Sequence, residues 1–462
     1  MRRYGSGQGK WVFVDWLGIE PGYGTRKGLD SCARGYCVPH GVELRVHKPE
    51  VVHEFCLPLD RPWERGCPGY ATFLNDGGRL RCWYEHWNGM GYAESDDGIA
   101  WRKPDLGLHE FDGSTANNLL NFSMHGACVF IDPNGPPNER YKMVGCKWSP
   151  EEKAAIGAVS PDGLHWQRLP EPVLRHQHAD TQSTCLYDGD LGQYILYTRQ
   201  TDGVMQRRGI NRATADDFRH FTASVPVLES NPLDPPDWDL YCNGYSRWPD
   251  TAGAHVMRLS IYKHTPDVVD VHLAVSRDGL TWHRPQGRDT WLDGGASHPD
   301  PYQSVYACAG ILATGTGEWS TYAGAAHRAH NEPRENLFQP TGILRARMRE
   351  DGFMSLSAEG PGEFWTIPFV LQSNTLCLNV RTPYAGYVRA ELLRSSGGNT
   401  GSATTGNEAI EGYALTDCTP IQGDHTDVPL TWSGSADLSA LQGQQVRLHV
   451  DMFKADLYAL RL

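Results

Sequence analysis

Hydrophobic and aromatic residues alternate with polar residues in short runs along most of the chain, and Gly, Pro, Asp or Asn closes each run. A period of two places successive side chains on opposite faces of a strand, so such runs indicate β-strands. Long segments with apolar residues at helical spacing are few. Typical runs are RLRCWYEHW (79–87), RYKMVGCKW (140–148), QYILYTRQ (193–200) and HVMRLSIYKH (255–264). The pattern predicts an all-β protein.

One nine-residue pattern occurs three times, as AESDDGIAW (93–101), AVSPDGLHW (158–166) and AVSRDGLTW (274–282). Each copy predicts a strand, a tight turn at Asp-Gly and a second strand that begins at the tryptophan. Glycine supplies the positive φ of the turn, the aspartate can hold the local amides, and the tryptophan can plug a neighbouring sheet. ATADDFRHF (213–221) and RARMREDGFMSL (345–356) are weaker copies.

The five copies are spaced as the blades of a propeller would be. Their aspartates lie roughly 55 to 75 residues apart, which suits a four-stranded blade with elaborated loops. We therefore predict a five-bladed β-propeller over residues 1–354, with WVFVD (11–15) as a candidate closing strand for the last blade. The five aligned residues are Asp97, Asp162, Asp217, Asp278 and Asp351, and we assign them to the repeated turn rather than to a site.

The repeat is absent from the C-terminal part of the chain. Residues 355–462 hold no further copy, but they contain alternating runs such as TLCLNV (375–380), GYVRAELL (386–393) and QQVRLHVDMF (444–453). We predict that this part forms a C-terminal antiparallel β-sandwich.

Charge and composition narrow the function. A net charge of −13 argues against nucleic acid as the partner, because phosphate binding needs a basic face. No apolar run is long enough for a membrane helix, and no signal peptide is visible, so we expect a cytoplasmic protein, with secretion after removal of a signal as the alternative. The 12 cysteines form no CxxC pair, so we expect buried thiols in a reducing compartment.

In a propeller the innermost strands converge on one axis, so the residues that open these strands meet at one mouth. The opening segments are DRPWERGCPGY (60–70), FSMHGACVF (122–130), QHADTQSTCLY (177–187), WDLYCNGYS (238–246) and HPDPYQSVYA (298–307). We expect their polar residues to surround one pocket. These residues are Glu64, His125, Asp180, Asp239 and Asp300.

Carboxylates gathered in a cleft suit glycoside hydrolysis, in which one carboxyl group protonates the departing oxygen and an ionised one attacks the anomeric carbon or activates water. The catalytic candidates are Asp180, Asp239, Asp300 and Glu64. The candidates for binding the sugar are His125, Glu85, Trp63, Arg199, Tyr241 and His327. The expected substrate is an oligosaccharide or polysaccharide.

The segment from WYEHWNGMGYAESDDGIAW onward (83–101) resembles the blade pattern of the five-bladed glycoside hydrolases of families 32, 43 and 68, which include invertases, fructanases and arabinanases. The resemblance implies a furanosidic, fructan-like or arabinan-like substrate and three acidic catalytic residues. ADTQSTCLYDGDLGQYILY (179–197) is similar to an element of those families and makes Asp180 the best match, and Asp300 offers a second Asp-Pro. The chain departs from the families at Glu64 and His125, and it lacks their Glu-Cys-Pro motif.

Two alternatives stay open. A sialidase-like hydrolase would use a tyrosine nucleophile and three arginines, for which Tyr241 and the many arginines leave room, although the repeat here lacks one residue of the sialidase box. A non-catalytic carbohydrate-binding propeller would use the carboxylates to hold loops. No cofactor is required on any of these interpretations, no metal ligands are assigned, and a structural calcium ion in the hub is an alternative without a ligand signature.

Overall fold

The chain forms two compact units. In the computed structural model, the larger unit holds residues 48–249 and 253–348, and the smaller unit holds residues 1–47, 250–252 and 349–462. The N-terminal residues, which we had expected in the first domain, therefore belong with the C-terminal unit. The structure describes residues 9–20, 39–66, 69–146, 154–175, 180–201, 206–285, 287–295, 297–332, 340–394 and 408–462.

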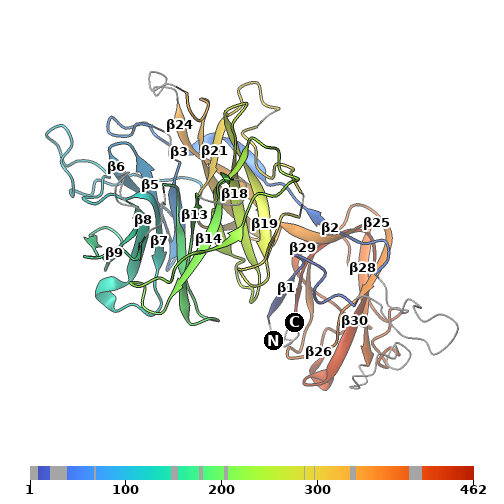
Figure 1. The fold of residues 1–462 in the computed structure, drawn as a ribbon. Coiled ribbons are helices and arrows are strands. Elements are labelled where there is room, and N and C mark those ends of the chain that lie inside the picture. The colour runs from blue at the N-terminus through green and yellow to red at the C-terminus, as the bar shows by residue number, and fades with distance from the viewer. Residues whose placement is uncertain are drawn as a thin grey trace. The chain divides into compact units, whose positions relative to one another are not determined.

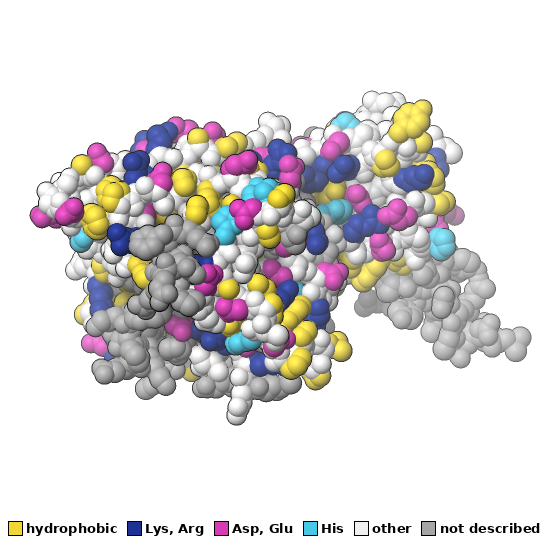
Figure 2. All heavy atoms as spheres, turned by 90° about the horizontal axis from the view of Figure 1, so that it is seen from above, with side chains coloured by type: hydrophobic (Ala, Val, Ile, Leu, Met, Phe, Trp, Pro, Cys, Tyr) yellow, Lys and Arg dark blue, Asp and Glu magenta, His cyan; other side chains and the backbone are white. Residues whose placement is uncertain are grey.

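Strands dominate both units, which confirms the all-β prediction. Among the residues that the structure describes, helix is limited to two short 3₁₀ turns, η1 (Pro137–Glu139) and η4 (Ser439–Leu441). No helix in the described part of the chain is long and apolar enough to cross a membrane. On the face seen in Figure 2, basic and acidic side chains of the described residues are interspersed.

The larger unit contains four sheets, which we divide into five strand groups (Figure 1). Group 1 is β4 (Ala71–Asp76), β5 (Arg79–His86) and β6 (Gly89–Ser95). Group 2 is β7 (His125–Ile131), β8 (Tyr141–Cys146), β9 (Ala154–Ser160), β10 (Gln167–Arg168) and β11 (Leu174–Arg175). Group 3 is β12 (Thr184–Asp188), β13 (Gln193–Gln200), β14 (Gly209–Ala215) and β15 (Val225–Leu228).

The fourth sheet has ten strands and contains groups 4 and 5. Val269 and Ser304 pair in parallel and so join the two groups, and the strand pairs β18–β19 and β21–β23 within the groups are antiparallel. Group 4 is β16 (Trp238–Cys242), β17 (Tyr245–Arg247), β18 (His255–Lys263), β19 (Val268–Ser276) and β20 (Trp282–His283). Group 5 is β21 (Ser304–Ala307), β22 (Leu312–Gly315), β23 (Glu318–Ala326), β24 (Thr341–Arg349) and β3 (Glu50–Pro58).

The repeated Asp-Gly turn has the geometry that the sequence predicts. In the third copy, Oδ1 of Asp278 accepts hydrogen bonds from the amides of Leu280 and Thr281 at 2.8 and 2.7 Å. Gly279 has a φ of +68°. The indole of Trp282 donates to the carbonyl of that glycine at 3.3 Å. The first two copies repeat these contacts at Asp97 and Asp162.

The two weaker copies differ from each other. Asp217 holds the amides of its turn in the same way, and Phe218 takes the glycine position with a φ of +62°. Asp351 instead lies in the smaller unit, where it is fully buried and bonded to Lys10 at 2.7 Å. The fifth aligned aspartate is therefore part of the other unit and not a turn between two strands of group 5.

Neighbouring groups are tied together at these turns. A side chain from the long strand of one group donates to the glycine carbonyl of the next group's turn. Group 5 thereby reaches group 1, group 1 reaches group 2, and group 3 reaches group 4. The three bonds are Tyr322 to Gly98 at 2.7 Å, Trp83 to Gly163 at 2.7 Å and Tyr197 to Gly279 at 2.6 Å.

The closing strand of group 5 is not the one expected. β3, from residues 50–58, pairs antiparallel with β24. The WVFVD segment contributes β1 (Lys10–Val12), which pairs with the final strand of the smaller unit. Both segments carry an alternating apolar pattern. Which of them pairs with β24 therefore depends on contacts between residues that are distant in the sequence.

The smaller unit is an antiparallel sheet of eight strands built around one long strand, and both chain ends lie there (Figure 1). β30 pairs with five of the other strands. The core of the smaller unit is formed by Leu, Val and Ile side chains of these strands together with Trp432 and Phe364. The strands are β1, β2 (Glu43–Val46), β25 (Met354–Trp365), β26 (Phe369–Val370), β27 (Cys377–Arg381), β28 (Tyr387–Arg394), β29 (Asp424–Pro429) and β30 (Gln445–Arg461).

Candidate active site

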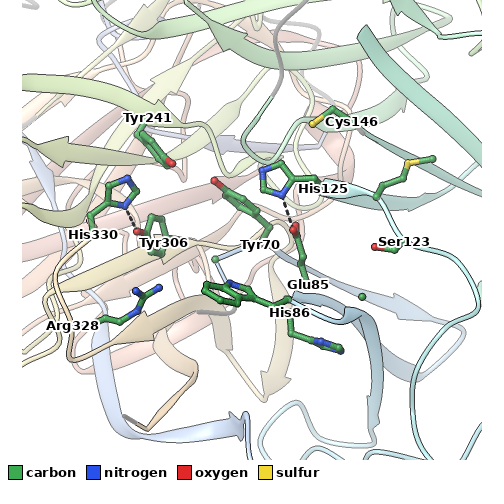
Figure 3. A pocket seen from close by; sticks show the side chains of 14 residues that line it. Tyr70, Glu85, His86, Ser123, His125, Cys146, Tyr241, Tyr306, Arg328 and His330 are labelled. Atoms are coloured by element: carbon green, nitrogen blue, oxygen red, sulfur yellow. Dashed lines mark hydrogen bonds and ion pairs between the residues drawn. The ribbon is translucent and has the colours of Figure 1, made fainter. Parts of the chain in front are cut away.

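A cavity of about 520 Å³ opens within the larger unit. Its wall comes from strands and strand ends of groups 1, 2, 4 and 5, which are far apart in the sequence. The polar and aromatic residues of the wall surround an open space (Figure 3). Gly69, Tyr70, Glu85, His86, Trp87, Gly89, Ser123, Met124, His125, Cys146, Tyr241, Tyr306, Arg328 and His330 line the cavity.

Glu85 and His125 form a hydrogen-bonded pair on the cavity wall (Figure 3). Oε1 of Glu85, near the end of β5, lies 2.6 Å from Nδ1 of His125, at the start of β7. Oε2 accepts the amide of Gly126 at 2.8 Å. Nε2 of His125 lies 2.9 Å from the main-chain oxygen of Asp180. Each side chain is largely buried, with 21% of Glu85 and 13% of His125 exposed.

These contacts fix where protons can sit. A carbonyl oxygen only accepts, so Nε2 of His125 carries a proton. Nδ1 then either holds a second proton and donates to a Glu85 carboxylate, or accepts the proton of a neutral Glu85. In both states one proton is shared between Oε1 and Nδ1. The pair is therefore a proton donor at the cavity wall.

Gly126 lets this pair form. Its φ is +60°, and a Cβ at this position would lie 2.3 Å from the main-chain oxygen of Thr181. Glycine adopts this backbone without strain, and only glycine, which lacks a Cβ, allows so close an approach. The His-Gly sequence at the start of β7 therefore places the imidazole and an amide donor on the same carboxylate.

Asp180 and Arg199 form an ion pair next to that site. The Arg199 side chain, on β13 in group 3, is 2% exposed, whereas the Asp180 side chain is 36% exposed. A buried guanidinium beside a carboxylate stabilises the charged form of the carboxylate. The main chain of Asp180 bonds His125 as well, so the residue contacts both the ion pair and the proton-sharing pair.

Tyr241 separates the Asp180 pair from a second ion pair. The Arg199 guanidinium lies 4.8 Å from the centre of its ring, and that of Arg208 lies 5.2 Å from it. Arg208 contacts Asp239 at 3.3 Å, and Asp239 also bonds His264 at 2.9 Å. Asp239 is therefore held behind the cavity wall by two cationic or titratable neighbours.

An aromatic part of the wall adjoins the Glu85–His125 pair, with the Tyr70 ring 5.5 Å from the His125 ring and 6.4 Å from the Tyr306 ring. Tyr70 is buried, and burial, together with the neighbouring Tyr241, raises its pKa well above the usual value. The Tyr306 hydroxyl and Nδ1 of His330 are hydrogen bonded at 2.5 Å. Burial lowers the pKa of His330 to about 4, so its imidazole is neutral at neutral pH. Cys146 also lines the cavity, and burial raises the pKa of its thiol to about 12.

Several of these wall residues are not among the candidates that the sequence predicts. Tyr70 and Tyr306 lie in the predicted strand-opening segments, but acidic residues were chosen there instead. Arg328 and His330 belong to HRAH (327–330), from which only His327 was chosen. The position of these residues in the strand-opening segments could have identified them. An aromatic or basic residue at a converging strand end faces the same space as an acidic one.

Glu64 is placed elsewhere than expected. Its side chain is fully buried and lies 2.6 Å from Nζ of Lys103. It also accepts hydrogen bonds from Tyr84 and from the amides of Asp60 and Arg61. These partners occupy the carboxylate, and it does not line the cavity. The structure gives Glu64 the role of holding its loop.

Three other predicted residues lie outside the cavity wall. Trp63 is half-buried and donates to Asn118 at 2.9 Å. Asp300 is 75% exposed and lies 3.3 Å from Nδ1 of His327, whose ring contacts Tyr302. The Asp300–His327 pair is thus a separate surface feature. The tight hydrogen bonding of Trp63 and the exposure of Asp300 explain why neither residue joins the cavity.

Cysteines and metal ligands add no further site. The nine described cysteines are free thiols, and seven of them are buried, as the sequence predicts. Among the described residues, no group of three or more His, Cys, Asp or Glu side chains is arranged to hold a metal ion.

No model of a protein family and no curated protein matches the sequence. Several solved structures are similar to it. An α-L-arabinofuranosidase from Podospora anserina in complex with cellotriose shares 11% identity, covering 66% of this chain and 98% of that chain with a TM-score of 0.47. An endo-1,4-β-xylanase from Bacteroides thetaiotaomicron shares 14% identity, covering 63% of this chain and 95% of that one with a TM-score of 0.44.

An N-acetylgalactosamine deacetylase from F. plautii, in complex with blood group B trisaccharide, is also similar. It shares 16% identity, covering 73% of this chain and 97% of that chain with a TM-score of 0.40. These solved neighbours are therefore mostly glycoside hydrolases, and they also include a deacetylase. What the cavity of this chain does must be argued from its own residues.

Proposed function

We propose that the protein is a glycoside hydrolase that cleaves a sugar bound in the cavity between strand groups 1, 2, 4 and 5. The observation that carries the proposal is the contact between Glu85 and His125, with Nε2 of His125 on the main-chain oxygen of Asp180. It supplies a shared proton on the cavity wall and holds the main chain of Asp180 against His125, while the Asp180 side chain pairs with Arg199 next to the residues that line the cavity. These are the two groups that glycosidic cleavage needs.

We further propose that the five strand groups are the blades of a five-bladed β-propeller, with the smaller unit as a β-sandwich. The hydrogen bond from Tyr322 in group 5 to Gly98 in group 1 supports a closed ring, because it joins the last group to the first. The parallel bridge between Thr72 and Ala309 supports it independently. A ring of blades accounts for a cavity whose wall comes from distant parts of the chain.

The reaction follows from the two pairs. The proton shared by Glu85 and His125 passes to the departing glycosidic oxygen, and the acid is thereby the Glu85–His125 pair as a unit. The carboxylate of Asp180, which is paired with Arg199, attacks the anomeric carbon or removes a proton from the attacking water. Asp239 and Glu64 take no part, because their own partners hold them behind the wall.

The remaining wall suits a sugar ring. Tyr70, Tyr241 and Tyr306 present aromatic surface and hydroxyl groups, and Trp87 is half-exposed beside them. Aromatic faces pack against the C–H faces of sugars, whereas the hydroxyl groups and His330 can bond sugar hydroxyls. On this interpretation the aromatic residues bind the sugar, and the Glu85–His125 pair beside Tyr70 carries the chemistry.

The test is turnover on a panel of fructans, arabinans, xylans, uronate-containing oligosaccharides and aryl glycosides, read out as release of reducing sugar. Glu85→Gln and Asp180→Asn are each expected to lower kcat by about 10²- to 10⁴-fold, while binding of the same sugar persists. Asp300→Asn is the matched control, since that carboxylate is exposed and away from the cavity, and it should leave kcat unchanged.

Two outcomes would contradict the proposal. If the unmutated protein binds sugars but releases none from any substrate, it is a binding protein instead. If Asp300→Asn removes turnover and the two cavity variants keep it, the chemistry lies at the Asp300–His327 pair.

A further inference from the structure

The cations around the cavity are not equally partnered. Arg199 is paired with Asp180, and Arg208 is paired with Asp239. No ion pair joins Arg328 to any residue that the structure describes, and its Nε is buried without a hydrogen-bond partner. A buried donor without a partner destabilises the fold, and more so when it is charged. Arg328 is thus an uncompensated cation in the wall of the cavity.

Arg328 stands on the aromatic side of the cavity, two residues after β23. Its guanidinium lies near Tyr306 and His330, on the side away from Cys146 and Ser123 (Figure 3). Because burial lowers the pKa of His330 to about 4, the neighbouring imidazole adds no charge at neutral pH. Arg328 is therefore the charged group on that side, and the one lining carboxylate, Glu85, is already bonded to His125 and Gly126.

We propose that Arg328 binds a carboxylate on the substrate, so that the sugar accepted by the cavity is an acidic one, such as a uronic acid residue. The inference rests on the proposed function, since it names the substrate class of that same cavity. A planar guanidinium donates two parallel hydrogen bonds to a planar carboxylate, and the pairing is strongest where water is excluded. The aromatic wall would then hold the ring while Arg328 fixes its orientation relative to the Glu85–His125 pair.

The experiment measures Kd by calorimetry in the Glu85→Gln variant, which prevents turnover. The probes are short oligosaccharides that contain glucuronic or galacturonic acid, each paired with its carboxyl-reduced, neutral form. The acidic form is expected to bind about 10- to 100-fold more tightly than the neutral form. Adding Arg328→Met should bring this ratio close to one, and Arg328→Lys should restore part of it. Arg79→Gln, at an exposed arginine on β5, is the control and should keep the ratio.

Arg328→Met should fold normally, since Arg328 forms no ion pair with the described residues, and its thermal unfolding midpoint provides the check. Equal binding of acidic and neutral probes, or a ratio that Arg328→Met leaves unchanged, overturns the inference. Tighter Arg328-dependent binding of a sulfated disaccharide than of any uronate overturns the choice of carboxylate.

The inference and the proposed function can fail separately. If the protein hydrolyses neutral sugars and Arg328→Met does not change the rate, the proposed hydrolase activity stands and the proposed acidic substrate is wrong. If uronates bind in a way that depends on Arg328 but are not hydrolysed, the proposed acidic ligand stands and the proposed hydrolase activity is wrong.

Discussion

At the scale of single residues, the shared proton of Glu85 and His125 is the feature on which the proposed chemistry depends. Oε1 and Nδ1 lie 2.6 Å apart, close enough to share a proton, and the Asp180 carbonyl holds the imidazole ring from its other side. A change to either side chain should therefore act on protonation of the leaving group more than on sugar binding.

His125→Gln tests this at the residue scale. The amide of glutamine can still bond Glu85, but it cannot share a proton, so kcat for a natural oligosaccharide should fall by about 10²- to 10³-fold. An aryl glycoside with a good leaving group needs little protonation and should lose far less. The comparison of kcat for the two substrates checks the prediction. Equal losses on both would show that His125 positions groups and does not share in the acid.

At the scale of elements, the Asp-Gly turns join three pairs of neighbouring strand groups. Its aspartate binds two amides of its own turn, and its glycine carbonyl receives a side chain from the adjacent group. The amides of Ala100 and Ile99 hold the pKa of Asp97 below its usual value, so the carboxylate is ionised near neutral pH. The turn is thus both a local reversal and a joint between groups.

Asp97→Ala removes both amide bonds while leaving Gly98 and its carbonyl in place. We expect the free energy of unfolding to fall by about 1–2 kcal/mol near neutral pH, as for the loss of two hydrogen bonds in a partly exposed turn. Urea unfolding followed by tryptophan fluorescence checks the value. Asp97→Asn keeps one acceptor oxygen and should recover part of the lost free energy of unfolding. If the Asp97→Ala protein is as stable as the parent, the two amide hydrogen bonds of the turn do not contribute to stability.

At the scale of the whole molecule, buried histidines link stability to pH. Burial lowers the pKa of His86, His255 and His330 from 6.5 to about 4. Between these values the unfolded chain binds protons that the folded protein does not. The free energy of unfolding should therefore be constant above about pH 7 and fall as the pH drops from about 6.5 toward about 4, by an amount on the order of 2 kcal/mol per histidine.

Urea unfolding between pH 7.5 and pH 4.5 measures that slope. His255→Gln should flatten it, since one of the three histidines no longer contributes, and His283→Gln, at an exposed histidine of β20, should leave it unchanged. If neither variant changes the slope of the free energy of unfolding against pH, groups other than His255 cause the loss of stability at acid pH.

The candidate site could be predicted in part, and particular residues show why. Asp180, Glu85, His125, Arg199 and Tyr241 were all selected from the sequence, and the structure brings them together around or beside one cavity. Their segments open strands that converge, so location alone was informative. The roles assigned to them changed, because Glu85 and His125 contact each other and not only a sugar.

Other assignments depended on partners that no local pattern reveals. Glu64 and Asp180 both precede a strand of the larger unit. The Glu64 side chain is buried against Lys103 and Tyr84, whereas the Asp180 side chain, paired with Arg199, is 36% exposed. WVFVD and the 50–58 strand are both alternating, and only long-range pairing assigns the first to β30 and the second to β24.

The sequence by itself determined what is local: strands, because alternation sets which face each side chain takes, and the Asp-Gly turns, because two amides and one positive φ lie within a few residues. The tertiary structure alone decided which strand ends share a cavity, which carboxylates are bonded behind its wall, and that Arg328 stands unpaired within it among the described residues. These contacts join residues on different strands, for example 40 positions apart for Glu85 and His125 and 55 for His125 and Asp180. Their energies depend on burial, which exists only once the sheets have come together.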